Sequence, residues 1–289
     1  EKLKAGDVFA KFEDAVGNIY EVNWKKCKRY GKGKMTYLIG DIHVYEGDWK
    51  DNLRDGKGKL IWNGHIYEGD WRKDKEEGQG EMIYSNGDIY NGEWKDGKKE
   101  GKGKMTCQNE ETYDGHCKDN KKEGKGRYIA ENGNIYEGDW KDGKREGKGK
   151  WIGANGDVYD GDWYCNWIEG KGKYIWNNGA IYEGDWRKSK QEGQGKKIFV
   201  NGIVYEGDYK DGKQEGKGKS TYQNGDIYDG DWKGDQKEGR GKYFSKSGDI
   251  YEGDWKHGLK DGKGKMAYQN RDIYDGDWKG DRQEGKGKM

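Results

Sequence analysis

The stretch that decides the fold runs from Tyr136 to Lys150 and reads Tyr-Glu-Gly-Asp-Trp-Lys-Asp-Gly-Lys-Arg-Glu-Gly-Lys-Gly-Lys. In its first and last parts, an aromatic residue or a glycine alternates with a charged residue, which is the two-residue period of a β-strand. Between them stands Asp-Gly, a pair typical of tight hairpin turns. The stretch therefore predicts one β-hairpin, with Tyr136, Gly138 and Trp140 on one face and the charged side chains on the other.

The same pattern recurs along almost the whole chain. We count positions from the opening Tyr, which is position 1 of each repeat. Gly stands at position 3 in eleven of twelve repeats, Trp at position 5 in ten, and Gly at positions 12 and 14 in all twelve. Of the 53 glycines, 44 fall at periodic places, so the glycine content is structural. The opening tyrosines are Tyr20, Tyr45, Tyr67, Tyr90, Tyr113, Tyr136, Tyr159, Tyr182, Tyr205, Tyr228, Tyr251 and Tyr274.

The composition excludes a conventional globular core. Leu, Ile, Val and Phe make up 34 of 289 residues and charged residues 38%, and an apolar content this low ordinarily indicates disorder. Disorder is nevertheless a poor description, because the formal net charge is only +1 and aromatics reach 14%, whereas disordered chains are usually aromatic-poor. Since 23 of the 40 aromatics occupy positions 1 and 5, we expect the repeat itself to bury them.

Several classes of protein are disfavoured by the same figures. No run approaches the 18 apolar residues of a membrane-spanning helix, and the first residues lack both the apolar stretch of a signal peptide and an initiator Met. The four cysteines have no metal-ligand spacing, which indicates a reducing compartment and hence a cytoplasmic protein. The near-zero net charge argues against nucleic acid as a partner.

This repeat, with its Tyr-Glu-Gly-Asp-Trp-Lys-Asp-Gly-Lys-x-Glu-Gly-Lys-Gly-Lys wording, resembles the MORN repeat from Tyr20 to Met289. The resemblance implies an all-β fold: an elongated, twisted, single-layer antiparallel sheet of about twelve 23-residue hairpins, forming a solenoid-like rod with an aromatic and glycine-lined groove. Residues 20–289 would be the twelve repeats, the last one incomplete, and residues 1–19 a degenerate N-terminal half-repeat or cap. We expect the chain to be a fragment of a longer one.

We expect glycine opposite the rings for a steric reason. An aromatic side chain that lies across neighbouring strands needs a facing position without a side chain. The aromatics that define the repeat in its clearest copies are Tyr136, Trp140, Tyr159, Trp163, Tyr182, Trp186, Tyr228, Trp232, Tyr251 and Trp255.

One connection between the two strands of a repeat breaks the charge pattern. It reads Tyr164-Cys165-Asn166-Trp167-Ile168 and carries no charge. One interpretation is a local aromatic cluster that folds back on its own sheet. The other is a partner-docking site, because exposed Trp and Tyr clusters are usual anchors of interfaces. Trp151 and Trp176, on the aromatic face of adjacent repeats, would enlarge that site.

Nothing in the sequence supplies catalytic, cofactor-binding or metal-binding residues. His43, His65, His116 and His257 stand at unrelated positions in different repeats, so no metal or catalytic cluster is expected from them. The paired acids of each repeat lie on a solvated face beside lysines, where no raised pKa is expected. We therefore expect a protein that is not an enzyme.

The family resemblance implies a binding role in one of three settings. Similarity to radial spoke head proteins implies a scaffold that braces or docks proteins in a cytoskeletal assembly, the ciliary axoneme. Similarity to junctophilins and plant phosphatidylinositol-phosphate kinases implies a phospholipid-associated tether, and a further alternative is the regulatory arm of a larger enzyme. The acids beside every row of lysines favour the first. Its partners would be other proteins of the assembly, extended peptides in the aromatic groove, or a second MORN chain.

Overall fold

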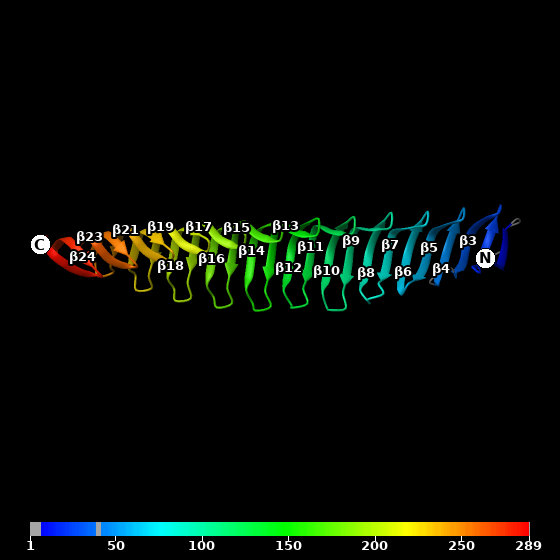
Figure 1. The fold of residues 1–289 in the computed structure, drawn as a ribbon, viewed down its shortest axis with the longest axis horizontal. Helices are drawn as coiled ribbons and strands as arrows, with labels where there is room; N and C mark the ends of the chain where they lie inside the picture. The colour runs from blue at the N-terminus through cyan, green and yellow to red at the C-terminus, as the bar shows by residue number, and fades with distance from the viewer. Residues whose placement is uncertain (1–6, 39–41, 289) are drawn as a thin grey trace. The chain divides into compact units, whose positions relative to one another are not determined.

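The computed structural model describes residues 7–38 and 42–288, and these residues form 25 β-strands and no helix. They divide into two compact units, residues 1–144 and 145–289. Within each unit, every strand pairs antiparallel with the strand that follows it in sequence. The predicted all-β, antiparallel hairpin fold is confirmed, and Figure 1 shows the strands of each unit side by side in sequence order.

The first unit contains twelve strands: β1 (Asp7–Glu13), β2 (Ile19–Lys25), β3 (Lys28–Tyr37), β4 (His43–Lys50), β5 (Leu53–Trp62), β6 (His65–Arg72), β7 (Lys75–Ile83), β8 (Ile89–Lys95), β9 (Lys98–Thr106), β10 (Thr112–Lys118), β11 (Lys121–Ile129) and β12 (Ile135–Lys141).

The second unit contains the remaining strands: β13 (Lys144–Ile152), β14 (Val158–Tyr164), β15 (Trp167–Ile175), β16 (Ile181–Arg187), β17 (Lys190–Ile198), β18 (Val204–Lys210), β19 (Lys213–Thr221), β20 (Ile227–Lys233), β21 (Gln236–Phe244), β22 (Ile250–Lys256), β23 (Leu259–Ala267), β24 (Ile273–Lys279) and β25 (Arg282–Lys288).

A two-residue turn joins the strands within a repeat. Between β8 and β9, Asp96 and Gly97 have φ angles of 50° and 81°, as a type I′ turn requires. The ladder then shifts register after Gly92, opposite Gly101, whose φ of 65° is left-handed. A bulge of this kind bends a strand, and glycine adopts its conformation without strain.

The glycines at positions 3 and 14 face each other across neighbouring strands. Gly58 of β5, for example, pairs with Gly47 on one side and with Gly69 on the other. The result in each unit is a row of backbone without side chains that crosses the strands.

The core of each unit is built from the repeat aromatics. The opening tyrosines from Tyr45 to Tyr274 are only 0–6% exposed and the tryptophans at position 5 from Trp49 to Trp278 only 2–7%. The prediction of an open groove lined by these rings is therefore wrong. The rings cover one another edge to face, and a side chain at position 10 covers the tryptophan of the next repeat, as when the Arg54 guanidinium lies 4.1 Å from the Trp71 ring centre.

The N-terminal strand continues the sheet beyond the first opening tyrosine. β1 pairs with β2 along seven residues, and the Phe12 ring stacks on Tyr20 with ring centres 4.7 Å apart. Val22, which stands where other repeats have Gly, is fully buried.

Candidate functional site

The repeat aromatics form a ladder of edge-to-face contacts within each unit. Tyr182 and Trp186 of one repeat have ring centres 5.0 Å apart, and Tyr205 meets Trp232 of the next repeat at 5.1 Å. The indoles at position 5 from Trp49 to Trp278 also donate a hydrogen bond to the carbonyl of the preceding repeat's glycine at position 14, as Trp232 does to Gly218 at 2.9 Å. The ten aromatics that the sequence singled out are all buried in this way, so they build the scaffold and do not meet a partner directly.

The tyrosine hydroxyl explains the invariant glycine at position 14. The Tyr45 hydroxyl donates to the Asp48 carbonyl at 3.0 Å and lies directly over Gly58, where a methyl group would collide with it. The glycine therefore makes room for the ring on one face; on the opposite face, its backbone lies bare between the outward side chains at positions 13 and 15.

That bare backbone is the floor of a groove on the charged face of each unit. In the first unit the groove has a volume of about 1,050 Å³ and crosses the strands from Phe9 to Asn91 over five glycines. In the second unit it has a volume of about 610 Å³, and its floor is formed by Gly230, Gly241, Gly253 and Gly264. The sequence predicted a groove lined by glycine and aromatic rings, but the side chains that wall it are charged.

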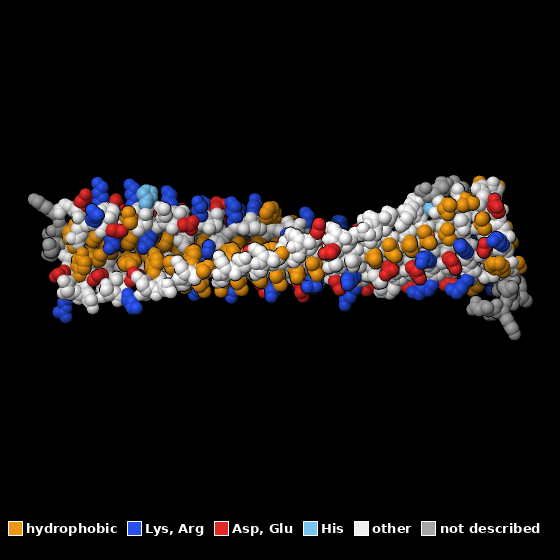
Figure 2. Space-filling model, turned by 90° about the horizontal axis from the view of Figure 1, so that it is seen from below, with side chains coloured by type: hydrophobic (Ala, Val, Ile, Leu, Met, Phe, Trp, Pro, Cys, Tyr) orange, Lys and Arg blue, Asp and Glu red, His pale blue; other side chains and the backbone are white. Residues whose placement is uncertain are grey.

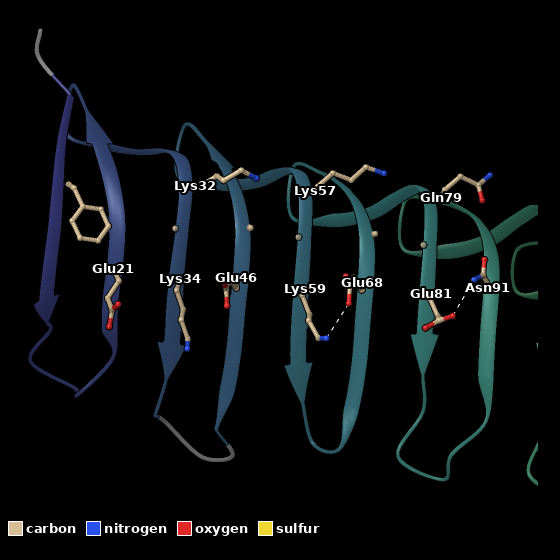
Figure 3. Close-up of a pocket in the computed structure, with 16 residues that line it drawn as sticks. Glu21, Lys32, Lys34, Glu46, Lys57, Lys59, Glu68, Gln79, Glu81 and Asn91 are labelled. Carbon is tan, nitrogen blue, oxygen red and sulfur yellow. Dashed lines mark hydrogen bonds and ion pairs between the residues drawn. The ribbon is translucent and has the colours of Figure 1, made fainter. Parts of the chain in front are cut away.

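One side of the groove, which we call the basic wall, is formed by the side chains at position 13. Figure 3 shows Lys32, Lys57 and Gln79 in this row. Lys32 and Lys57 each pair with an aspartate at position 4 of the next repeat, as Lys57 does with Asp70 at 2.6 Å. The lysine side chain is 69% exposed and the aspartate 33%, so the cation is the group that this wall presents.

The aspartates of the basic wall are held by two donors. Asp185 accepts from the Lys171 ammonium at 2.9 Å and from the Gln194 backbone amide at 3.0 Å. These bonds, the lysine bond above all, hold the pKa of Asp185 below its ordinary value, although partial burial opposes the shift. The acid stays ionised and anchors the lysine beside the groove.

The opposite side, which we call the acidic wall, is formed by the side chains at position 2. Figure 3 shows Glu46, Glu68 and Asn91 in this row, with lysines at position 15 beside them. In the second unit, Glu252 pairs with Lys242 at 3.2 Å, and here the acid is the more exposed partner, at 70% against 41%. The groove therefore presents cations along one wall and carboxylates along the other.

Figure 2 shows a row of hydrophobic side chains beside rows of acidic and basic ones near the N-terminal end of the chain. Exposed apolar residues of the first unit include Ile61 and Ile89. Sequence reasoning missed both the segregation of charge across the glycine row and these isoleucines, although the 23-residue period of the charges was visible in the sequence.

The uncharged connection predicted as a docking site forms the turn between β14 and β15. Tyr164 and Trp167 lie opposite each other in the strand pair, and both are more than half exposed. Ile168 is buried, because position 10 of each repeat covers the aromatic core. Ile168 therefore does not belong to the exposed surface on which it was placed.

Trp151 and Trp176 lie near the other end of this hairpin, Trp151 in β13 opposite Tyr159 of β14 and Trp176 just after β15. Both contact Tyr174, with ring centres 6.5 and 4.7 Å away. Trp167 begins β15 and Trp176 follows its end, a separation of roughly 30 Å along a strand. The five predicted docking residues therefore form two separate clusters.

The row of ion pairs between neighbouring turns is interrupted at the Tyr164–Trp167 turn. In several other repeats, a lysine at position 9 reaches an aspartate at position 7 of the next repeat, as Lys98 does to Asp119 at 2.7 Å and Lys190 to Asp211 at 2.9 Å. Cys165 and Trp167 occupy these two positions in the Tyr164–Trp167 turn. This turn therefore presents an apolar pair where its neighbours present paired charges.

A second feature that the sequence analysis missed is the cation at position 10. The Lys237 ammonium lies within 5.0 Å of the ring centres of Tyr222, Tyr228, Tyr243 and Trp255. Burial lowers the pKa of Lys237 to about 8. The contact is a cation–π cluster that closes the aromatic core from outside.

Metal and membrane features were searched over residues 7–38 and 42–288. No group of three or more His, Cys, Asp or Glu side chains there is placed to hold a metal ion, and the four cysteines are free thiols. None of these residues lies in a helix long and apolar enough to cross a bilayer.

Comparison with known protein families identifies the repeat. The MORN repeat matches residues 45–65, 67–89, 90–112, 113–135, 136–158, 159–181, 182–204, 205–227, 228–250, 251–273 and 274–289. The chain belongs to the MORN repeat family. Its eleven matched MORN repeats begin at Tyr45, and the hairpin that opens at Tyr20 lies outside them. The MORN repeat is a non-catalytic binding module, so this chain is a repeat scaffold.

A search of the curated proteins finds no match to the sequence. Among solved structures, the MORN chain is similar to the TCP10 domain of Danio rerio CPAP in complex with a peptide of Danio rerio STIL. The TM-score is 0.39 and the identity 10%, over 86% of this chain and 97% of that one.

It is also similar to the SAS-4 (dCPAP) TCP domain of Drosophila melanogaster in complex with a proline-rich motif of Ana2. Here the TM-score is 0.35 and the identity 14%, over 60% and 86% of the two chains. Likenesses this distant carry no argument about function.

Proposed function

We propose that this chain is a scaffold that docks proteins in a large cytoskeletal assembly, the ciliary axoneme, in the manner of radial spoke head proteins. The observation that carries the proposal is the groove of each unit, whose bare glycine floor lies between two walls of charged side chains. A partner chain can approach such a floor closely, and the walls supply charged contacts at regular intervals.

The linkage between repeats supports a bracing role. Repeats with Trp at position 5 join the repeat before them within a unit through a ring contact and an indole hydrogen bond, supplemented by ion pairs, as Trp186 and Asp185 show. Contacts of this kind repeat without interruption along most of each unit. A force applied at one repeat is therefore passed to the next through several bonds at once.

A phospholipid tether is the second candidate. The observation that favours it is the outward row of cations in the basic wall, of which Arg240 is 85% exposed. Each of these cations is paired with an acid, and the acidic wall lies across the groove, which weakens attraction to an anionic bilayer.

Fractionation of ciliated cells that express the tagged chain tests the first candidate. We expect the chain to stay with the axonemes after detergent removes the membranes. Recovery in the detergent-soluble fraction, together with co-sedimentation of the purified chain with phosphoinositide vesicles at physiological salt, would instead favour the tether.

A further inference from the structure

The groove of the second unit places opposite charges in register over three successive repeats. Its basic wall contains Lys217, Arg240 and Lys263, with Asp254 between them, and its acidic wall contains Asp229, Glu252 and Asp275, with Lys242 and Lys265 between them. Members of each wall are 23 residues apart in sequence and two strands apart in the sheet. At about 4.7–4.9 Å per strand, charges of the same sign recur along each wall every 9.4–9.8 Å or so.

The cations of the basic wall point away from the sheet. Lys217 and Lys263 are each 76% exposed, whereas Asp231, the partner of Lys217, is 34% exposed. Asp231 also accepts a hydrogen bond from the Arg240 backbone amide at 2.9 Å. A ligand carboxylate can therefore reach the cations while the aspartates remain bound to the backbone.

The width of the groove selects the shape of its ligand. The two walls stand two residues apart along each strand, about 6.6–6.8 Å, and nothing projects from the glycines between them. An α-helix with its side chains is about 10–12 Å wide. An extended chain fits this space, and a helix does not.

The spacing of the charges determines which conformation of an extended ligand keeps its side chains in register with the walls. In a polyproline II segment every third residue returns to the same side, after about 9.3 Å, which matches the wall spacing to within about 0.5 Å per repeat. In a β-strand, side chains return to the same side after about 6.6–6.8 Å, so charges on one side would lose register within one repeat.

We propose that this groove binds a partner segment in the polyproline II conformation with a three-residue period of one acidic, one basic and one small or proline residue. The acidic residues face Lys217, Arg240 and Lys263, the basic residues face Asp229, Glu252 and Asp275, and the third residue lies on the glycine floor. This inference rests on the proposed docking function and names the chemistry of its partner.

Binding of synthetic peptides to the purified full chain tests the proposal. The probe is a fluorescently labelled peptide of four Pro-Glu-Lys triplets, followed by fluorescence anisotropy at 0.15 M salt or so. Two control peptides of the same length test whether the three-residue period matters for binding. One alternates Glu and Lys, and the other has the composition of the triplet peptide with identical residues grouped in blocks. We expect the triplet peptide to bind at least about fivefold more tightly than either control. Equal binding of a control, or no binding of the triplet peptide, overturns the proposal.

Variants of the groove locate the binding site. Arg240→Gln and Glu252→Asn introduce residues that these two rows already contain as Gln79 and Asn91, so we expect both to fold. Each variant should weaken the binding of the triplet peptide at least about threefold. Lys233→Gln, outside the groove, should leave the binding of this peptide unchanged. Unchanged binding by both groove variants contradicts the proposal. If the peptides fail but the chain still stays with the axonemes, this inference falls and the docking function stands.

Discussion

Two tyrosines of one repeat, Tyr205 and Tyr209, separate the roles of a ring and of its hydroxyl in this fold. Both are at least 95% buried. The Tyr205 hydroxyl donates to the Asp208 carbonyl at 3.0 Å, whereas the Tyr209 hydroxyl, at a position usually held by Trp, has no hydrogen-bond partner. The first hydroxyl therefore stabilises the repeat, and the second is buried at a cost.

Replacing each of these tyrosines by phenylalanine gives a matched pair. We expect Tyr205→Phe to lower the free energy of unfolding by about 1 kcal/mol, because it removes a satisfied buried hydrogen bond. Tyr209→Phe removes an unpaired hydroxyl and should leave stability unchanged or raise it. Urea unfolding of both variants measures the difference. A larger loss of unfolding free energy for Tyr209→Phe than for Tyr205→Phe would contradict the assignment of the hydrogen bond to Tyr205.

Lys237 makes stability depend on pH in a defined direction. Burial lowers its pKa in the folded state to about 8 from an ordinary value of 10.5, so the folded protein carries an energetic penalty while the lysine is charged. That penalty disappears as the pH rises from about 8 toward 10, and the free energy of unfolding therefore increases over this range.

In the variant Lys237→Met, the free energy of unfolding should therefore increase less with pH than in the parent chain. Urea unfolding at pH 7 and at about pH 9.5 compares the variant with the parent chain, and Lys233→Met, which changes an exposed lysine, serves as control. An equal gain in stability with pH in the parent chain and in Lys237→Met would mean that the cation–π contacts offset the burial of the ammonium.

At the scale of the hairpin, the Tyr164–Trp167 turn differs from its neighbours only in side chains. Its φ angles at Cys165 and Asn166 are 46° and 72°, close to the 50° and 84° of Asp211 and Gly212 in another repeat. The backbone of the turn is therefore ordinary, and its exposed rings contribute little to the fold.

We expect Tyr164→Lys with Trp167→Lys to leave the unfolding temperature within about 2 °C of the parent chain, since surface changes rarely alter stability by more than about 0.5 kcal/mol. If the turn is a docking site, the double variant recovers fewer partners from an axonemal extract. Arg187→Lys, a conservative change at position 6 of the next repeat, is the control. Identical recovery by the variant and the parent chain would remove this turn from the docking surface.

The hairpin is also the scale at which sequence reasoning succeeded. The period of two residues and the Asp-Gly pairs sufficed to predict strands and turns, and the repeat sufficed to predict antiparallel pairing. The sequence predicted that the repeat buries the rings, but not how it covers them, because that depends on the bulge opposite Gly101 and its equivalents and on cations from neighbouring repeats. The charged groove was missed because alternation alone does not show which member of an ion pair is exposed.

At the scale of the whole molecule, each unit is a chain of nearest-neighbour contacts. Trp232 contacts Tyr205 and Tyr228 at 5.1 and 5.3 Å and donates to Gly218. These partners belong to its own repeat and to the one before it. In such an architecture a local defect weakens adjacent repeats first.

We therefore expect Trp232→Ala to cost about 3–5 kcal/mol of local stability. Amide hydrogen exchange should quicken in β18 to β21 and remain close to that of the parent chain in β3 to β8. Exchange that quickens equally over the whole chain would show that the repeats unfold as a single cooperative unit.

The central claim is that this MORN chain is a docking scaffold whose partners bind in the charged groove. The most direct measurement is the amount of chain that stays with detergent-extracted axonemes, compared between the parent chain and a variant that combines Arg240→Gln with Glu252→Asn. We predict that the parent chain stays with the axonemes and that most of the variant is released, although both are folded. Release of the parent chain, or equal retention of the two, would contradict the claim.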